Sequence, residues 1–491
     1  MESQINIDYE VAIIGTGFGG LCVAIALKRA SIDSFVMLEK GDDIGGTWRE
    51  NQYPGCACDV PSHLYSFSFA PNPDWSRMYS PQPEIWDYLR RVTDRYQLRH
   101  CIRFNTALTS ARYDEASGTW LVETKNGPAI RARSLVSAMG PLSRPSLPDI
   151  PGLPSFSGKL FHSQQWNHSV DLTGKRVAVI GTGASAIQIV PQIAAKIKQL
   201  HLFQRTAPWI IPRMDRKITD FEHALFRWLP FTQRLYRYLI YWKLEIRVLG
   251  FTFKPDLLKA SEKLALKHMH KQIADPKLRA RLTPDYRLGC KRVLLADDFY
   301  PALTRPNVEL VTDGIRSIDT NSITTNDGVE RDVDIIVIAT GFHVTDNYFC
   351  GAIIGKGGVD IADAWRDSAE AYYGITTAGF PNFFMIMGPN SGLGHNSIIF
   401  MIEAQVNYIL GAIQHLRREK LSSLILRPEV LLRFNDSLQR FLKTSVWSTG
   451  CRSWYLDRNG RNTKLWPGFT WKFRKLTWRF NAADYEAESA R

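Results

Sequence analysis

The sequence has no run of about 18 uncharged apolar residues, the length at which an apolar helix could cross a bilayer. We therefore expect no transmembrane helix. The stretch before the first apolar segment, "MESQINIDYE", has neither a basic region nor a long apolar run. We expect no secretory signal peptide and a cytoplasmic location.

Cysteine is also scarce, with seven residues scattered through 491. An odd, scattered set argues against a secreted disulfide framework and predicts reduced thiols. Cys56 and Cys58 are separated by one residue, which is not the usual spacing of metal ligands or of a redox pair. The sequence therefore predicts no metal site.

The chain is basic, with 61 Lys and Arg against 48 Asp and Glu and a formal net charge of +13. Such a field favours anionic partners: nucleotide phosphates, nucleic acid or anionic lipid. Hydrophobic residues make up 45% of the chain, so we expect it to fold. Its length predicts two or three domains rather than one core.

A first glycine-rich turn follows the apolar segment "YEVAII" and precedes an apolar helix pattern. Gly15, Gly17 and Gly20 fit G-x-G-x-x-G, in which the glycines allow a tight turn, close approach of a pyrophosphate and helix packing. Glu39 ends the next predicted strand, where a carboxylate accepts hydrogen bonds from ribose hydroxyls. Because an acid at this place repels a 2′-phosphate, the turn favours FAD.

A second turn follows "RVAVI", with Gly181, Gly183 and Ala186 in the related pattern G-x-G-x-x-A. Arg205 stands as far past Gly181 as Glu39 stands past Gly15, and Thr206 follows it. A guanidinium binds a 2′-phosphate bidentately, so this site favours NADPH over NADH.

Two dinucleotide sites indicate electron transfer from nicotinamide to flavin and an α/β fold with two Rossmann-like domains. Residues 224–255 are aromatic, basic and helical in pattern, and we interpret them as part of a helical insert. Contact of this insert with a membrane surface stays open. The predicted division is a split FAD domain (1–145 and 373–491), an NADP domain (150–215 and 286–372) and the insert (216–285).

Two further motifs carry a resemblance to a known family. Phe156, Gly158, His162 and Trp166, in the spacing F-x-G-x-x-x-H-x-x-x-W, resemble the fingerprint of type I Baeyer–Villiger monooxygenases. The stretch "GGTWRENQYPGCACD" is similar to their second signature and contains Thr47, Trp48 and Asp59. Asn167 departs from the Pro or Asp that usually follows the fingerprint.

This resemblance implies an enzyme with FAD and NADPH that uses molecular oxygen to convert a ketone into an ester or lactone. It implies that Arg292, in "GCKRVLLADD", stabilises a flavin peroxide, and that Asp59 pairs with Arg292. Thr47 and Trp48 would contact the cofactor, Lys291 the NADP phosphate, and Trp454 would lie in a mobile loop that closes over NADP. His162 would be structural, tying the linker between the domains.

Three alternatives stay open. A flavin monooxygenase that oxygenates nitrogen or sulfur shares the fold but does not need Arg292 and Asp59. A disulfide reductase shares the two-nucleotide layout but needs a redox cysteine pair that Cys56 and Cys58 do not match. A non-catalytic basic protein would bind lipid or nucleic acid. We favour the Baeyer–Villiger monooxygenase over these three, with a small ketone and oxygen as partners and no nucleic acid. The sequence does not predict an oligomeric state.

Overall fold

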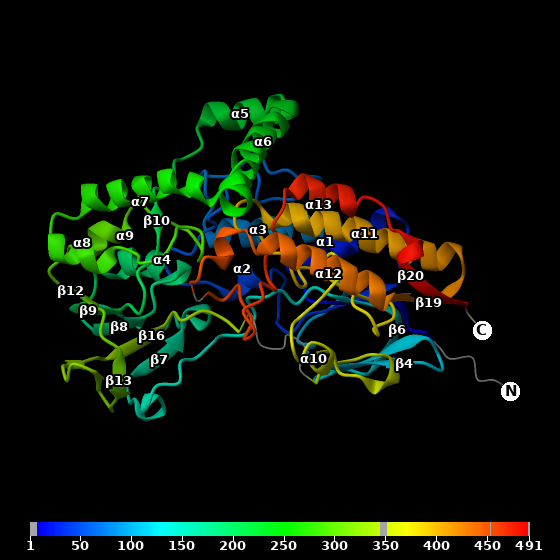
Figure 1. Ribbon diagram of the computed structural model, residues 1–491, viewed down its shortest axis with the longest axis horizontal. Helices are drawn as coiled ribbons and strands as arrows, with labels where there is room; N and C mark the ends of the chain where they lie inside the picture. The colour runs from blue at the N-terminus through cyan, green and yellow to red at the C-terminus, as the bar shows by residue number, and fades with distance from the viewer. Residues whose placement is uncertain (1–6, 344–350, 452, 490–491) are drawn as a thin grey trace.

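The computed structural model describes residues 7–343, 351–451 and 453–489 (Figure 1). It contains two large sheets whose central strands are parallel. In each sheet one strand leads through a glycine-rich turn into a helix. A helical segment is inserted in the chain between two strands of the second sheet. The predicted α/β class with two Rossmann-like units and a helical insert is confirmed.

The first sheet has the order β17-β4-β5-β6-β1-β2-β3, with β18 beside β6. Its centre is parallel: Val11 pairs with Phe35 of β2 on one side and with Ser134 of β6 on the other. Both faces are buried, which explains why β1 reads as a continuous apolar run. The strands are β1 (Tyr9–Ile14), β2 (Phe35–Leu38), β3 (Ile102–Arg103), β4 (Leu108–Asp114), β5 (Thr119–Thr124), β6 (Ile130–Ser137), β17 (Ile353–Ile354) and β18 (Phe383–Met385).

Helices cover this sheet, and part of the C-terminal region packs against it or joins it. Helix α1 packs against α11, and Phe383 of β18 pairs with Leu135 of β6. An antiparallel pair of strands closes the C-terminal part. The elements are α1 (Phe18–Arg29), α2 (Thr47–Glu50), α3 (Gln82–Arg95), α10 (Ile361–Ala364), α11 (Ile398–Arg418), β19 (Leu421–Leu426), α12 (Pro428–Leu442), α13 (Thr470–Leu476) and β20 (Tyr485–Ser489).

The second sheet is entirely parallel, in the order β12-β9-β8-β16-β7. Its strands are β7 (Lys159–His162), β8 (Arg176–Ile180), β9 (Gln199–Phe203), β12 (Val308–Val311) and β16 (Ile335–Ile338). Helices α4 (Ala184–Ile193) and α9 (Phe299–Leu303) pack against each other beside it. Smaller sheets consist of β10 (Ile210–Ile211) with β11 (Leu294–Leu295), and of β13 (Ile315–Ile318), β14 (Ser322–Thr325) and β15 (Glu330–Asp332).

The insert contains α5 (Asp220–Trp228), α6 (Pro230–Glu245), α7 (Leu258–Gln272) and α8 (Pro276–Leu282). Thr219 and Glu222 form a capping box at the start of α5, and Pro230 opens α6 at a position where its missing N–H costs nothing. The α5–α6 hairpin projects beyond the rest of the molecule (Figure 1). Short 3₁₀ or π segments complete the chain: η1 (Arg99–Cys101), η2 (Leu153–Ser155), η3 (Ser163–Gln165), η4 (Leu249–Phe253), η5 (Pro255–Leu257), η6 (Lys356–Gly358), η7 (Val446–Ser448) and η8 (Ala482–Asp484).

The division into domains stays a prediction, with one difference at a boundary. Residues 353–354 fall within the predicted NADP range 286–372, but they form β17, which pairs with β4 of the first sheet. A strand of two residues is too short to leave a periodic pattern in the sequence. None of the helices in the described ranges has both the length and the apolarity that crossing a membrane requires.

Candidate active site

The first glycine-rich turn joins β1 to α1. Gly15 has φ of +99°, and a Cβ there would lie 2.8 Å from the carbonyl oxygen of Ala138, so both the backbone angle and the space demand glycine. Gly20 packs against the carbonyl of Gly15. Gly17 is the N-cap of α1, and a Cβ added there would lie 3.7 Å from the backbone Cα of Gly46. The free N–H groups at the start of α1 are therefore open to a phosphate.

Thr47 and Trp48 lie beside this turn. They begin the short helix α2 directly after Gly46, whose added Cβ would be 3.1 Å from Cα of Gly17. Thr47 is exposed, whereas Trp48 is buried and donates from Nε1 to the Tyr65 hydroxyl at 3.1 Å. The second signature thus supplies the wall of the first nucleotide turn.

Glu39 lies at the end of β2, as predicted, but it is almost fully buried. Its Oε2 accepts from the backbone N–H and the hydroxyl of Thr16, at 3.1 and 2.6 Å. Its Oε1 accepts from Gly41 N–H at 2.9 Å and from Arg49 at 3.1 Å. Glu39 therefore shapes the turn, and Arg49 is a partner that the sequence patterns did not identify.

The second turn joins β8 to α4 and repeats this geometry. Gly181 has φ of +111°, and a Cβ there would lie 2.5 Å from the carbonyl oxygen of Ala339. A Cβ at Gly183 would meet nothing within 4 Å, so the backbone at the start of α4 is accessible. Ala186 is fully buried against the sheet.

Two cations lie together near the second turn. Thr182 donates to the carbonyl of Thr206 at 3.1 Å, which fixes the segment that carries the exposed Arg205 to the turn. Burial lowers the pKa of Lys291, and the positive charge of the neighbouring Arg205 lowers it further. The charge of Asp285 acts on Lys291 in the opposite direction, but neither cation forms an ion pair with a described residue. Two such cations beside the start of α4 are suited to a phosphate.

Asp59 and Arg292, far apart in sequence, form an ion pair through Nη2 and Oδ2. Burial alone raises the pKa of Asp59, but the charge and hydrogen bond of Arg292 outweigh it and hold that pKa below its usual value. The charge of Asp59 raises the pKa of Arg292 in turn. Arg292 also donates to the Leu393 carbonyl at 3.4 Å, and its side chain remains 38% exposed.

Tyrosines from two other segments surround this pair. Burial raises the pKa of Tyr455 to about 12, and the charges of Arg292 and Asp59 both act on it. Burial likewise raises the pKa of Tyr65, the hydroxyl partner of Trp48, and the same two charges act on it as well. The ion pair, in which Asp59 is the last residue of the second signature, therefore lies near both Tyr65 and the C-terminal loop.

The fingerprint motif forms the edge of the second sheet. Gly158 packs beneath Phe156, since a Cβ there would lie 2.4 Å from the Asp334 carbonyl and 2.5 Å from the Phe156 ring. Phe161 contacts Trp166 edge to face, with ring centroids 5.1 Å apart. Packing thus explains the glycine and the two aromatic positions.

His162 is buried and bonded on both ring nitrogens. Its Nε2 lies 3.0 Å from the Gly341 carbonyl, and its Nδ1 accepts from the Gln164 N–H at 3.1 Å. Burial lowers its pKa, so the ring is neutral at pH 7 with the proton on Nε2. Gln164 reaches Glu50 of α2, so the motif links the second sheet to the wall of the first turn.

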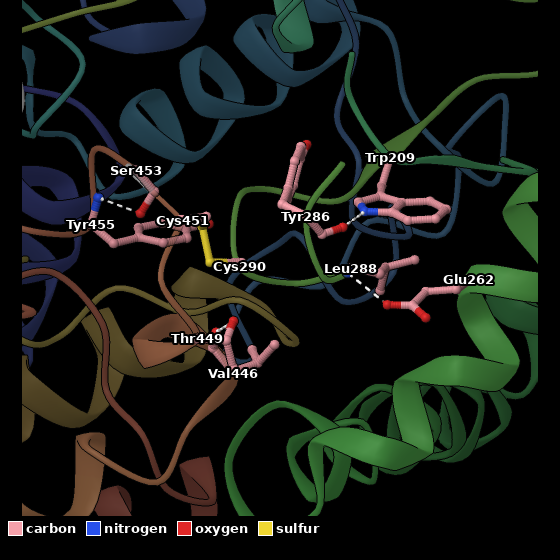
Figure 2. Close-up of a disulfide and its surroundings, with 10 residues drawn as sticks. All are labelled: Trp209, Glu262, Tyr286, Leu288, Cys290, Val446, Thr449, Cys451, Ser453 and Tyr455. Atoms are coloured by element: carbon pink, nitrogen blue, oxygen red, sulfur yellow. Dashed lines mark hydrogen bonds between the residues drawn. A yellow bond between two sulfur atoms is a disulfide. The ribbon is translucent and has the colours of Figure 1, made fainter. Parts of the chain in front are cut away.

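Trp454 is exposed and its ring contacts that of Tyr455 at a tilt, with ring centroids 4.4 Å apart. A disulfide between Cys451 and Cys290 anchors this C-terminal loop to the segment that continues into Lys291 and Arg292 (Figure 2). The loop is thus placed beside the ion pair by a covalent bond.

Comparisons with known proteins agree with this geometry. A model of the FMO-like family, described as flavin-binding monooxygenase-like, matches residues 8–356. A Baeyer-Villiger monooxygenase of Pseudomonas aeruginosa is 51% identical, over 97% of this chain and 91% of its own length. The chain belongs to the Baeyer–Villiger monooxygenases.

Solved structures of this family share the fold. The OTEMO complex with FAD and NADP is 27% identical with a TM-score of 0.88, and the match covers 98% of this chain and 100% of that one. Cyclohexanone monooxygenase from Rhodococcus sp. Phi1, bound to NADP+, is 28% identical with a TM-score of 0.88, covering 99% and 100%.

The prediction that all cysteines of this monooxygenase are reduced is wrong for Cys290 and Cys451. They are 161 residues apart, so no local spacing could indicate the pair. Cys56 and Cys58 are free and buried, and burial raises the pKa of the Cys56 thiol to about 12. Their role as space-filling residues agrees with that environment.

A buried polar cluster beside the site was also missed. Glu245, at the end of α6, accepts from Asn396 and from the N–H of Thr470, each at 2.5 Å, and lies 3.6 Å from His395. Burial raises the pKa of Glu245, but these neighbours lower it to a net value below normal. The sequence feature that could have indicated this cluster is Glu245, a single acid in a basic helix. Glu245 connects the insert to the loop that contains Asn396 and Leu393, and the Leu393 carbonyl accepts from Arg292.

Proposed function

We propose that this chain is an NADPH- and oxygen-dependent FAD monooxygenase that converts ketones into esters or lactones, with Arg292 as the fixed cation of the reaction. The observation that carries the proposal is the ion pair of Arg292 and Asp59, which joins the last residue of the second signature to a segment 233 residues further along the chain. A flavin monooxygenase that oxygenates sulfur or nitrogen has no need of this pair.

The two turns fit the two dinucleotides. At the start of α1, an added Cβ on Gly17 would lie 3.7 Å from Cα of Gly46, and the charge of Arg49 at this turn is paired with Glu39. This turn therefore suits FAD, which has no 2′-phosphate. The start of α4 is open at Gly183, with Arg205 and Lys291 nearby for the 2′-phosphate of NADPH. When bound, NADPH supplies a hydride and FAD supplies the reduced ring at which oxygen is activated.

Arg292 contributes a positive charge that does not titrate in the working pH range. Asp59 stays ionised because its pKa is lowered, and it holds the guanidinium through one Nη group. The remaining exposed part of Arg292 is available to negative charge that develops on the reacting oxygens. A positioned cation in a partly buried site stabilises such charge more than water does.

His162 takes no part in proton transfer in this account. Its Nε2 proton is committed to the Gly341 carbonyl and its ring is neutral, so it holds the linker in place. We propose that Trp454, on the loop that Cys451 anchors, covers the nicotinamide dinucleotide; its exposure and its position three residues after that disulfide support this role.

Product analysis tests the proposal. The purified protein is incubated with NADPH and a panel of cyclic, open-chain and aryl ketones, together with thioethers and amines. We expect ester or lactone from at least one ketone, with NADPH consumed in step. Sulfoxide or N-oxide without any ester would contradict the proposal.

A cytoplasmic location stays part of the proposal. Cell fractionation followed by immunodetection tests it, and recovery of the protein from an extracytoplasmic fraction would contradict it. The Cys290–Cys451 disulfide makes this test informative, because stable disulfides are uncommon in reducing compartments.

A further inference from the structure

Helix α6 carries an exposed apolar stripe along its whole length. Its members are spaced so that they share one helix face: Phe231, Leu235, Tyr238, Leu239 and Trp242. Exposed Ile246 and Leu249 follow just past the end of α6. At the projecting tip, α5 adds Trp228, which is 84% exposed, and Phe221. This many large exposed apolar side chains on one helical hairpin are uncommon on a protein that meets only water.

The stripe does not result from a loosely attached helix. The opposite face of α6 is buried and bonded to the body of the molecule. Gln233 donates to the Asn72 carbonyl at 2.6 Å, Arg237 donates to the His63 carbonyl at 2.7 Å, and Tyr241 lies 2.9 Å from the Thr470 hydroxyl. The hairpin is held on one side and presents the other side outward (Figure 1).

Positive charge accompanies the stripe. Between residues 224 and 255 the only acid is Glu245, which is fully buried, whereas Arg234, Lys243 and Lys254 are exposed. The surface of this segment is therefore apolar and cationic, with no exposed carboxylate of its own.

Helix α13 extends this face. It packs beside the end of α6 and the segment that follows, with Thr470 bonded to Glu245 and the Phe253 and Phe469 rings 5.7 Å apart. Exposed aromatic and basic side chains alternate along α13 and just beyond it: Trp471, Lys472, Lys475, Trp478 and Arg479. Two helices from distant parts of the chain thus show the same chemistry side by side.

We propose that this face, formed by the tip of α5, the stripe of α6 and the outer side of α13, docks on an anionic phospholipid bilayer. The aromatic and aliphatic side chains would enter the headgroup region, and Lys and Arg would meet lipid phosphates. A second copy of the chain is a poorer partner, because docking the same face would oppose like charges. The proposal does not depend on the ketone chemistry of the active site.

Vesicle co-sedimentation of the FAD-loaded protein tests this proposal. One set of vesicles is phosphatidylcholine alone, and the other contains about one third phosphatidylglycerol. We expect binding to the anionic vesicles only, and weaker binding when salt is raised from about 0.1 M to about 1 M, because surface charges are then screened. Recovery of the protein in the supernatant with both vesicle types would overturn the proposal.

Two variant pairs separate the contributions. Trp228→Gln with Phe231→Gln removes apolar contact at the tip, and Arg234→Glu with Lys243→Glu reverses charge. We expect each pair to lower the apparent partition coefficient on anionic vesicles about tenfold or more. Activity on a water-soluble ketone is expected to stay at the wild-type level, which shows that the variants fold.

Matched controls come from α12. Leu432, 60% exposed, and Arg433, also exposed, are changed to Gln and Glu, and both variants should bind as the wild type does. Equal binding by the test variants and these controls would overturn the assignment of the face. So would a dimer, measured by light scattering, that the Trp228 and Phe231 changes dissociate while vesicle binding is absent, because the stripe would then cover a second copy.

Discussion

Single residues in this site differ in whether their charge is already neutralised. Asp59 is paired with Arg292, and Glu39 with Arg49. In the part of the chain that the structure describes, Arg205 and Lys291 form no ion pair, although each lies within the field of the other. Two adjacent positive charges without an ion-pair partner indicate a binding site for an anion.

Arg205→Ser should therefore weaken the binding of NADPH but not that of NADH. A charge-assisted hydrogen bond contributes about 1.5–3 kcal/mol, so we expect KM for NADPH to rise about tenfold or more. The value for NADH should change little, because NADH has no 2′-phosphate. Steady-state kinetics with both coenzymes measure this. Arg316→Ser, an exposed arginine on β13, is the control, and equal losses for NADPH and NADH would contradict the assignment.

At the scale of elements, His63 connects the loop between α2 and α3 to the helical insert. Its Nδ1 lies 3.1 Å from Gln233 of α6, and its ring packs edge to face on Phe226 of α5 with centroids 4.9 Å apart. Burial lowers its pKa from 6.5 to about 4, with the charges of Glu222 and Arg237 acting in opposite directions. The folded protein keeps this imidazole neutral, whereas the unfolded chain protonates it below about pH 6.5.

This difference predicts acid sensitivity. The stability that neutral His63 contributes is fully present above pH 6.5 and is lost as the pH falls toward 4, because the unfolded chain then binds the extra proton. At about 1.4 kcal/mol per pH unit, the loss reaches roughly 3 kcal/mol. His63→Asn keeps an acceptor for Gln233 and should flatten the pH dependence of unfolding. His100→Asn, at an exposed position, should not, and equal pH profiles for His63→Asn and the wild type would refute this role.

At the scale of the whole molecule, one covalent bond closes a long loop. The Cys290–Cys451 disulfide joins the Arg292 segment to the C-terminal loop across 161 residues of sequence (Figure 2). It restricts the unfolded chain and holds Tyr455 and Trp454 near the ion pair.

Removing this bond should destabilise the protein. For Cys290→Ser or Cys451→Ser we expect a loss of about 2–4 kcal/mol in the free energy of unfolding, the usual range for a native disulfide. Thermal denaturation measures the change, with Cys101→Ser, a free cysteine, as control. Thiol titration of the denatured wild type should find two more thiols after reduction than before. An unchanged count would show that the bond does not form.

Local sequence patterns predicted much of this structure. They did not predict contacts between residues that are far apart in the chain. Gly15, Gly20 and Gly181 were found because a tight turn fixes residue types within a few positions. Glu39 and Arg205 followed because a strand–helix–strand unit has a nearly constant length. The fold class could therefore be read from the sequence, whereas the short strand β17 could not.

The ion pair itself required the resemblance to a family. Nothing in the sequence alone joins Asp59 to Arg292, since their proximity depends on how the insert and the two sheets pack. The same reason explains why Arg49 as the partner of Glu39, the disulfide at Cys290, and the cluster around Glu245 were missed. Each is a contact between elements that are distant in the chain.

The central claim is that Arg292 serves the oxygen-dependent half of the reaction and not the reduction of flavin. The most direct measurement compares Arg292→Ala with Arg287→Ala, since both arginines have side chains that are 38% exposed and both are ion-paired. In anaerobic stopped-flow experiments, NADPH should reduce the flavin of Arg292→Ala at nearly the wild-type rate. Ester formation with oxygen should fall about a hundredfold or more, with hydrogen peroxide released instead, while Arg287→Ala keeps making ester. Ester produced by Arg292→Ala at the wild-type rate would contradict the account.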